Sequence, residues 1–160
     1  MSVRISRATL GAVLAHAAAE PDREVCGLLF GAADRIDAAA PAGNAAADPG
    51  RHFEIDLAAL FAAIRAERSG GPRIAGHYHS HPSGSAAPSA RDAAAAHQPG
   101  RLWLIIAGDD AAFWREVPGG AVQGAFEPVR LVVDDGFGGC TPQIQSPQGP
   151  PSSTSTQRKG

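Results

Sequence analysis

The sequence predicts a single domain of mixed α/β class, in which about three helices flank a central mixed sheet. Alanine-rich stretches with apolar residues at helical spacing alternate along the chain with short apolar runs. Ser, Asp, Gly and Pro residues that cap helices or form turns separate these segments. The chain has 160 residues, of which 44% are hydrophobic, enough for one core but not for two full-sized domains.

Each expected helix begins at a side chain that can accept a hydrogen bond from its first turn. The N-cap residues are Ser6, Asp56 and Ser89. Prolines or glycines follow each helix. The expected helices cover residues 6–19, 57–68 and roughly 89–97.

The expected strands are short apolar or alternating runs bounded by turn residues. Residues 35–39 are expected to pair with residues 24–31. Stretches rich in Ala, Pro, Gly and Ser, residues 40–51 and 81–88, are expected to be loops. The expected strands cover residues 24–31, 35–39, 52–55, 73–80, 102–107, 112–117, 121–126 and 129–133.

The composition changes near the C-terminal end of the sequence. From residue 134 onward Gly, Pro, Ser, Thr and Gln dominate, and few side chains there can contribute to a core. Such a segment cannot compensate the entropy of ordering it. Residues 1–133 are therefore expected to form the domain, and residues 134–160 a disordered tail that folding does not require.

Charge and cysteine content exclude several classes of protein. The net charge of −2 leaves no basic excess for nucleic-acid binding. No apolar run approaches the length that spans a membrane, and the first residues lack the pattern of a secretory signal, so we expect a cytoplasmic protein. Cys26 and Cys140 cannot build a disulfide framework, and Cys26 is expected to be a buried hydrophobic residue. Nothing in the sequence indicates the oligomeric state.

Three histidines lie within five residues, at positions 77, 79 and 81. Alternate residues of a strand share a face, so the three rings are expected on one side. Two imidazoles at such spacing are good zinc ligands, and Asp92, in the first turn of the third expected helix, can supply a carboxylate. Two histidines and one carboxylate leave a fourth position for water, as in a catalytic zinc site.

These residues resemble the motif of the JAMM (MPN-plus) zinc metalloproteases. The matching residues are His79-Ser80-His81-Pro82, Ser89 and Asp92. Upstream, Glu24 matches within Glu24-Val25-Cys26-Gly27-Leu28-Leu29. The likeness covers roughly residues 3–133, and the segments 52–56 and 88–92 look like the short prokaryotic single-domain members. It implies the topology of the family, which is related to that of the deaminases.

The resemblance also implies a role for each matching residue. His79, His81 and Asp92 would bind one zinc ion per chain, Glu24 would be the general acid/base for the attacking water, and Ser89 would help to stabilise the oxyanion. Burial at the start of a strand would raise the pKa of Glu24 toward the range that such a base needs. His77 falls outside the motif and is expected to support the site rather than bind the metal.

The family resemblance further implies a peptidase or isopeptidase. Compact prokaryotic members act on ubiquitin-fold or sulfur-carrier proteins and cut after a C-terminal Gly-Gly. Residues 40–51 and 83–88 are the sizeable loops expected near the site, and they leave little room to position a second ubiquitin. The expected substrate is therefore the C-terminal tail of a small ubiquitin-fold or sulfur-carrier protein.

Three other interpretations were compared with this one. A zinc deaminase needs His-x-Glu followed by Pro-Cys-x-x-Cys, and neither string is present. A helical His-Glu-x-x-His protease is excluded because that string is also absent. A non-catalytic MPN-type scaffold or interaction module remains the alternative.

Overall fold

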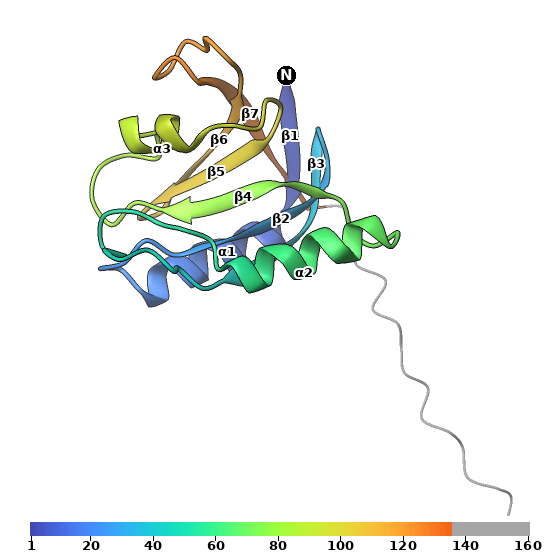
Figure 1. Ribbon diagram of the computed structural model, residues 1–160. Helices are drawn as coiled ribbons and strands as arrows, with labels where there is room; N and C mark the ends of the chain where they lie inside the picture. Colours follow the sequence, from blue (N-terminus) through green and yellow to red (C-terminus); the bar gives the residue numbers. More distant parts are fainter. Residues whose placement is uncertain (136–160) are drawn as a thin grey trace, which may run out of the picture.

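The computed structural model describes residues 1–135, and the rest of the predicted tail lies outside this range. Seven strands close into a barrel in the order β1-β3-β2-β4-β5-β6-β7 (Figure 1). The strands are β1 (Ser2–Ser6), β2 (Cys26–Ala32), β3 (Arg35–Ala42), β4 (Ile74–Ser80), β5 (Leu102–Ala107), β6 (Asp110–Glu116) and β7 (Phe126–Asp134).

The closed barrel corrects the expectation of a central sheet flanked by about three helices. Strand β1, to which the sequence analysis assigned no element, pairs in parallel with β3 on one side and with β7 on the other. It alternates exposed residues with Val3 and Ile5, which are almost completely buried. Five residues are a weak local signal, and the contacts that close the barrel join opposite ends of the domain, so the local pattern could not predict closure.

Two of the expected strands are wrong. Residues 52–55 form only an isolated antiparallel bridge, between Ile55 and Asn44, and no strand. The carbonyl of His52 and the N–H of Glu54 are bonded to the side chain of Asn44 instead of continuing that pairing. Residues 121–125 form a tight turn with positive φ at Gln123 and Gly124, and one continuous strand, β7, follows it. The expected pairing of β2 with β3 is confirmed, and it is antiparallel.

The three expected helices are confirmed as α1 (Arg7–Ala19), α2 (Leu57–Arg68) and α3 (Ala90–Ala95). The hydroxyl of Ser6 accepts a hydrogen bond from the Thr9 N–H, and Asp56 accepts one from Ala59, as their N-cap roles require. Helix α1 inserts Val13 into the core, whereas α2 lies along the outside of the barrel with no fully buried residue (Figure 1). None of the helices in the described residues has the length and apolar character needed to cross a membrane.

Strand β4 carries the histidines and lies between β2, to which it is antiparallel, and β5, to which it is parallel. Gly76 permits the close approach of β5, because a Cβ there would lie 1.8 Å from the carbonyl oxygen of Leu102. The barrel interior beneath these strands is filled by Tyr78, Leu104, Ile106 and Phe113. The end of β4 is thus held by strands on both sides and by a packed core below.

Candidate metal centre

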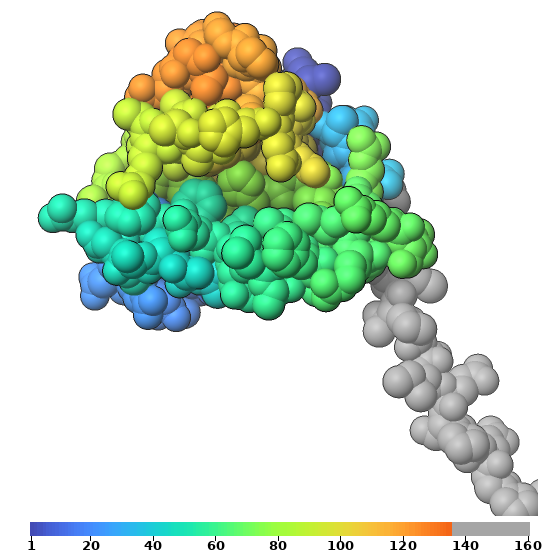
Figure 2. Space-filling view, viewed as in Figure 1, coloured from blue at the N-terminus to red at the C-terminus, as the bar shows by residue number. Residues whose placement is uncertain are grey.

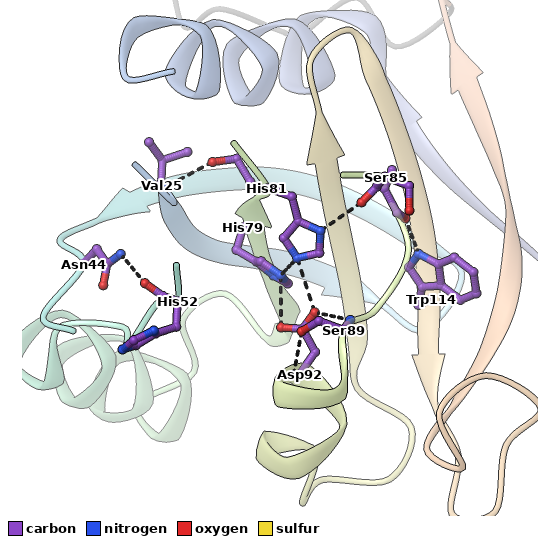
Figure 3. Close-up of polar contacts among 11 residues, drawn as sticks. Val25, Asn44, His52, His79, His81, Ser85, Ser89, Asp92 and Trp114 are labelled. Atoms are coloured by element: carbon purple, nitrogen blue, oxygen red, sulfur yellow. Dashed lines mark hydrogen bonds and ion pairs between the residues drawn. The ribbon is translucent and has the colours of Figure 1, made fainter. Parts of the chain in front are cut away.

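His79 and His81 converge with Asp92 at the end of β4 (Figure 3). The Nε2 atoms of the two histidines lie 3.0 Å apart. Asp92 Oδ1 lies 3.2 Å from Nε2 of His79, and Asp92 Oδ2 lies 3.3 Å from Nε2 of His81. The two carboxylate oxygens and the two ring nitrogens therefore face a common point.

The first turn of α3 holds the Asp92 carboxylate in place. The Ser89 N–H donates to Asp92 Oδ2 at 2.8 Å, and the Asp92 N–H donates to the Ser89 hydroxyl at 3.1 Å. This reciprocal pair is a capping box, and it leaves the Asp92 carboxylate directed at the histidines rather than at solvent. Ser89 therefore acts as the helix N-cap expected from the sequence.

The donor set fits a zinc ion. Zinc bonds of about 2.0–2.2 Å in tetrahedral geometry place neighbouring ligand atoms roughly 3.4 Å apart. The two Nε2 atoms lie 3.0 Å apart, and each carboxylate oxygen of Asp92 lies 3.2–3.3 Å from one of them. One ligand atom from each of the three residues lies within 4.8 Å of the others, which is compatible with one shared ion. With two imidazoles and one carboxylate, the fourth tetrahedral position stays open for water.

Electrostatics favour the metal-binding protonation states of Asp92 and His79. Burial alone would raise the pKa of Asp92, but its contacts with His79 and His81 outweigh burial and hold that pKa well below the usual range. Burial lowers the pKa of His79, so its ring is neutral near pH 7. A carboxylate and a neutral imidazole are the ligand forms that bind metal.

Two aromatic rings pack against His79. The Phe53 ring stacks on it at 4.2 Å between centroids, with 19° between the planes. Trp103 meets it edge-on at 5.8 Å. Nδ1 of His79 is buried and has no hydrogen-bond partner among the described residues, so ring packing rather than a hydrogen bond fixes the orientation of this ligand.

His81 is held differently, through the loop that follows β4. Its Nδ1 lies 2.9 Å from the carbonyl oxygen of Ser85, and this contact directs Nε2 toward Asp92. The indole of Trp114 donates to the carbonyl of Ala86 at 2.8 Å and so ties the same loop to β6 (Figure 3).

His77 shares the face of His79 but takes no part in the convergence. It packs edge-on against Trp103 at 4.1 Å between ring centroids. Its Nε2 is buried without a partner in the described part of the chain, and burial lowers its pKa to about 3. The ring therefore stays neutral and contributes packing next to the metal centre.

Glu24 lies beside the metal centre, two residues before β2. Its side chain lines a groove of about 150 Å³ together with Ser89 and Asp92. Burial raises its pKa to about 7, opposed by His81 and reinforced by Asp92. A carboxylate with such a pKa can both accept and release a proton near neutral pH.

Four residues that shape the site could not be identified from the sequence: Asn44, Phe53, Trp103 and Trp114. Phe53 stood within a segment that matched the family, but no local pattern indicates which ring it packs against. The other three gave no signal, because each acts through a contact with a residue at least eight positions away.

Comparison with known proteins places this site within a family. The model of the family described as prokaryotic homologues of the JAB domain matches residues 6–117, more than half of the chain. The chain belongs to this family. A desampylase from Haloferax volcanii is 39% identical to it over 103 residues, which are 61% of this chain and 74% of that protein.

Solved structures share the fold of this JAB-domain protein. The solution structure of DSY2949 from Desulfitobacterium hafniense matches with a TM-score of 0.69 and 25% identity, covering 83% of this chain and 93% of that one. The crystal structure of AF2198, a JAB1/MPN domain protein from Archaeoglobus fulgidus, matches with a TM-score of 0.51 and 22% identity, covering 82% and 98%. The likeness to AF2198 concerns the fold alone.

Phe53→Leu is expected to weaken zinc binding without unfolding the protein. The substitution keeps an apolar side chain but removes the stacked ring, which is worth about 0.5–1.5 kcal/mol beyond its buried area. The zinc dissociation constant should rise by roughly two- to tenfold in a competition titration with a chromophoric chelator. Phe61→Leu is the matched control, because Phe61 is 52% exposed on α2. Equal constants for the two variants would show that the stacking does not orient His79.

Zinc affinity is expected to fall as the pH is lowered, because the His81 ring becomes protonated. Burial alone would lower the pKa of His81, but its hydrogen bonds to Asp92 and Ser85 outweigh burial and raise it. A proton therefore competes with zinc for this ring as the pH falls through that raised pKa. His79, with its lowered pKa, does not compete in this range.

The measurement is best made in the Glu24→Gln background, because Glu24 also titrates near pH 7. One competing proton raises the dissociation constant about tenfold per pH unit. This slope holds below the raised pKa of His81, so competition titrations between about pH 5 and pH 8 should show a dissociation constant that rises as the pH falls. A dissociation constant that does not change over this interval would contradict the geometry assigned to His81.

Proposed function

We propose that this protein is a zinc-dependent peptidase or isopeptidase that removes a small ubiquitin-fold or sulfur-carrier protein by cutting after its C-terminal Gly-Gly. The observation that carries the proposal is the convergence of His79, His81 and Asp92 beside a buried Glu24. The 39% identity to a desampylase supports the deconjugating activity and the class of substrate.

His79, His81 and Asp92 would hold the ion. Zinc bound by these three residues would supply Lewis acidity, lowering the pKa of a water molecule and polarising the scissile carbonyl. The remaining work falls to side chains of the chain itself, of which Glu24 lines the same groove as Asp92 and Ser89.

Glu24 would move the proton in this reaction. It takes a proton from the attacking water as the new C–O bond forms, and it gives that proton to the nitrogen as the amide C–N bond breaks. The products are a carboxylate at the end of the modifier and a free amine on the target. A pKa raised to about 7 suits both steps, because neither protonation state is strongly favoured near neutral pH.

Ser89 would contribute at the carbonyl oxygen. Its hydroxyl accepts the Asp92 N–H, and its own proton remains free to donate to an oxygen that gains negative charge. The capping and oxyanion roles use different atoms of the same hydroxyl group, so they are compatible.

The surface near the site suits a protein substrate. Figure 2 shows a hollow between α2 and the chain that follows α3, where a cavity of about 260 Å³ is lined by residues including Leu60, Ile64 and Trp103. Ala95 lines both this hollow and the groove that contains Glu24. On α2, Leu57 and Phe61 are 60% and 52% exposed, and such apolar exposure is typical of surfaces that contact another protein.

A substrate panel tests the proposal. The zinc-loaded protein is incubated with a ubiquitin-fold modifier joined through its C-terminal Gly-Gly to a lysine of a target protein, and in parallel with polyubiquitin. We expect release of the modifier, slower or no cleavage of polyubiquitin, and loss of activity when a chelator removes the metal. A protein that binds one zinc ion per chain but cleaves neither substrate would instead support the non-catalytic scaffold.

A further inference from the structure

We propose that Asn44, the only asparagine of the chain, is a positioning residue that fixes Glu24 relative to the metal centre. It does so by joining the backbone of Glu24 to the segment 43–56, here called the clamp loop. This inference rests on the proposed function, because Glu24 is the base of that reaction.

The side-chain amide of Asn44 makes four hydrogen bonds. Its Nδ2 donates to the carbonyl oxygens of Glu24, at 2.8 Å, and of His52, at 3.0 Å. Its Oδ1 accepts from the N–H groups of Ala46, at 2.9 Å, and of Glu54, at 3.1 Å. A primary amide has two donor hydrogens and two acceptor lone pairs, so its full capacity is used. Figure 3 shows Asn44 directed at His52 across this loop.

Glu24 needs such partners because it precedes β2 and lies outside the sheet. A backbone carbonyl or N–H group without a ladder partner must find another one when it is buried. The Glu24 N–H donates to the carbonyl oxygen of Pro49 at 2.7 Å, and its own carbonyl accepts from Asn44. Both backbone groups of Glu24 are therefore bonded to the clamp loop.

The residues on either side of Glu24 are bonded to β4 instead. The Val25 N–H donates to the hydroxyl of Ser80 at 2.9 Å, and that hydroxyl donates to the carbonyl of Arg23 at 3.4 Å. Ser80 lies between the two histidine ligands in the sequence. The chain around Glu24 is thus bonded to the clamp loop and to the ligand-bearing strand β4. Asn44 supplies one of the two hydrogen bonds between the Glu24 backbone and the clamp loop.

The clamp loop also touches the metal centre directly. Phe53, which stacks on His79, lies between His52 and Glu54, the two loop residues that Asn44 binds. Residues 51–54 form one wall of the groove that Glu24 lines. The amide of Asn44 therefore joins the base, the groove wall and the ring that packs on a ligand into one unit.

Asn44→Asp is the most informative variant. It keeps the shape of the side chain and the two acceptor bonds, but it replaces the two donor bonds with a carboxylate oxygen facing the carbonyls of Glu24 and His52. A displacement of the base by about 1 Å can reduce turnover about 100-fold. We expect kcat to fall by about 10- to 100-fold and KM to change by less than about threefold.

The experiment compares zinc-loaded wild type, Asn44→Asp and Asn44→Ala, with Ser6→Ala as the control that removes a helix N-cap far from the site. The readouts are zinc content, Tm, kcat and KM for a modifier conjugate, and hydrogen exchange of the Glu24 amide and residues 44–54. We expect both Asn44 variants to fold and to keep zinc. Both should show less exchange protection at these residues and a lower kcat. Ser6→Ala should lower Tm and leave the other readouts unchanged.

The proposal is overturned if exchange protection at Glu24 is the same in Asn44→Asp as in wild type, or if the loss of activity lies wholly in KM. It is also overturned if kcat falls no further than in Ser6→Ala. Hydrogen exchange needs no substrate, so it still decides the role of Asn44 if the wild type hydrolyses no conjugate and the proposed function fails.

Discussion

Replacing His79 or Asp92 with alanine is expected to remove most of the bound zinc and all measurable hydrolysis. Each variant leaves two of the three protein ligands, and a site with two ligands is weak because each ligand contributes directly to metal affinity. Elemental analysis after gel filtration measures the metal, and it should find one zinc ion per chain in the wild type.

Two controls separate metal loss from unfolding. Asp92→Ala also removes the capping box of α3, at a cost of about 1 kcal/mol, so Asp92→Asn is the closer variant because its carbonyl can still accept the Ser89 N–H. His97→Ala changes an exposed histidine and should keep its zinc. A full equivalent of zinc in both His79→Ala and Asp92→Ala would show that these residues are not the ligands.

Glu24→Gln is expected to keep the zinc and the fold while losing turnover. Glutamine is nearly isosteric with glutamate but cannot accept the proton of the attacking water. A general acid/base is typically worth about 10² to 10⁴ in rate, so kcat should fall by at least the lower figure while KM changes little. Stopped assays on a Gly-Gly-linked conjugate, at equal zinc content, measure the effect.

Glu127→Gln is the matched control, because this carboxylate lies in β7 and bonds to the Ala121 N–H. It should hydrolyse the substrate at the wild-type rate. A Glu24→Gln variant that runs at near wild-type rate with zinc bound would exclude Glu24 as the base. Loss of zinc or of the fold in that variant would instead assign the carboxylate a structural role.

The sequence could predict the parts of the site that depend on local spacing. His79 and His81 share a strand face because they are two positions apart, and Ser89 and Asp92 form a capping box because they are three positions apart. The helices were predictable for the same reason, since each combines an N-cap with apolar residues at helical spacing.

The parts that sequence reasoning missed depend on contacts between distant segments. Closure of the barrel requires β1 to lie between β3 and β7, which no local pattern encodes. Asn44 lies in a stretch of small residues typical of a loop, and its role appears only when Glu24 and His52 meet it in space. The alternation of residues 52–55 suggested a strand, but the pairing stops at one bridge of Ile55 with Asn44, and His52 and Glu54 bond to the side chain of Asn44.

The most direct test of the account is the intact mass of the products formed from a modifier conjugate by zinc-loaded wild type and by Glu24→Gln. We expect a modifier that ends in a Gly-Gly carboxylate and a target with a free lysine amine, one water having been added across the amide. We also expect Glu24→Gln to form these products at no more than about 1% of the wild-type rate with the same zinc content. Cleavage at any other bond, or an equal rate in the two proteins, would contradict the account.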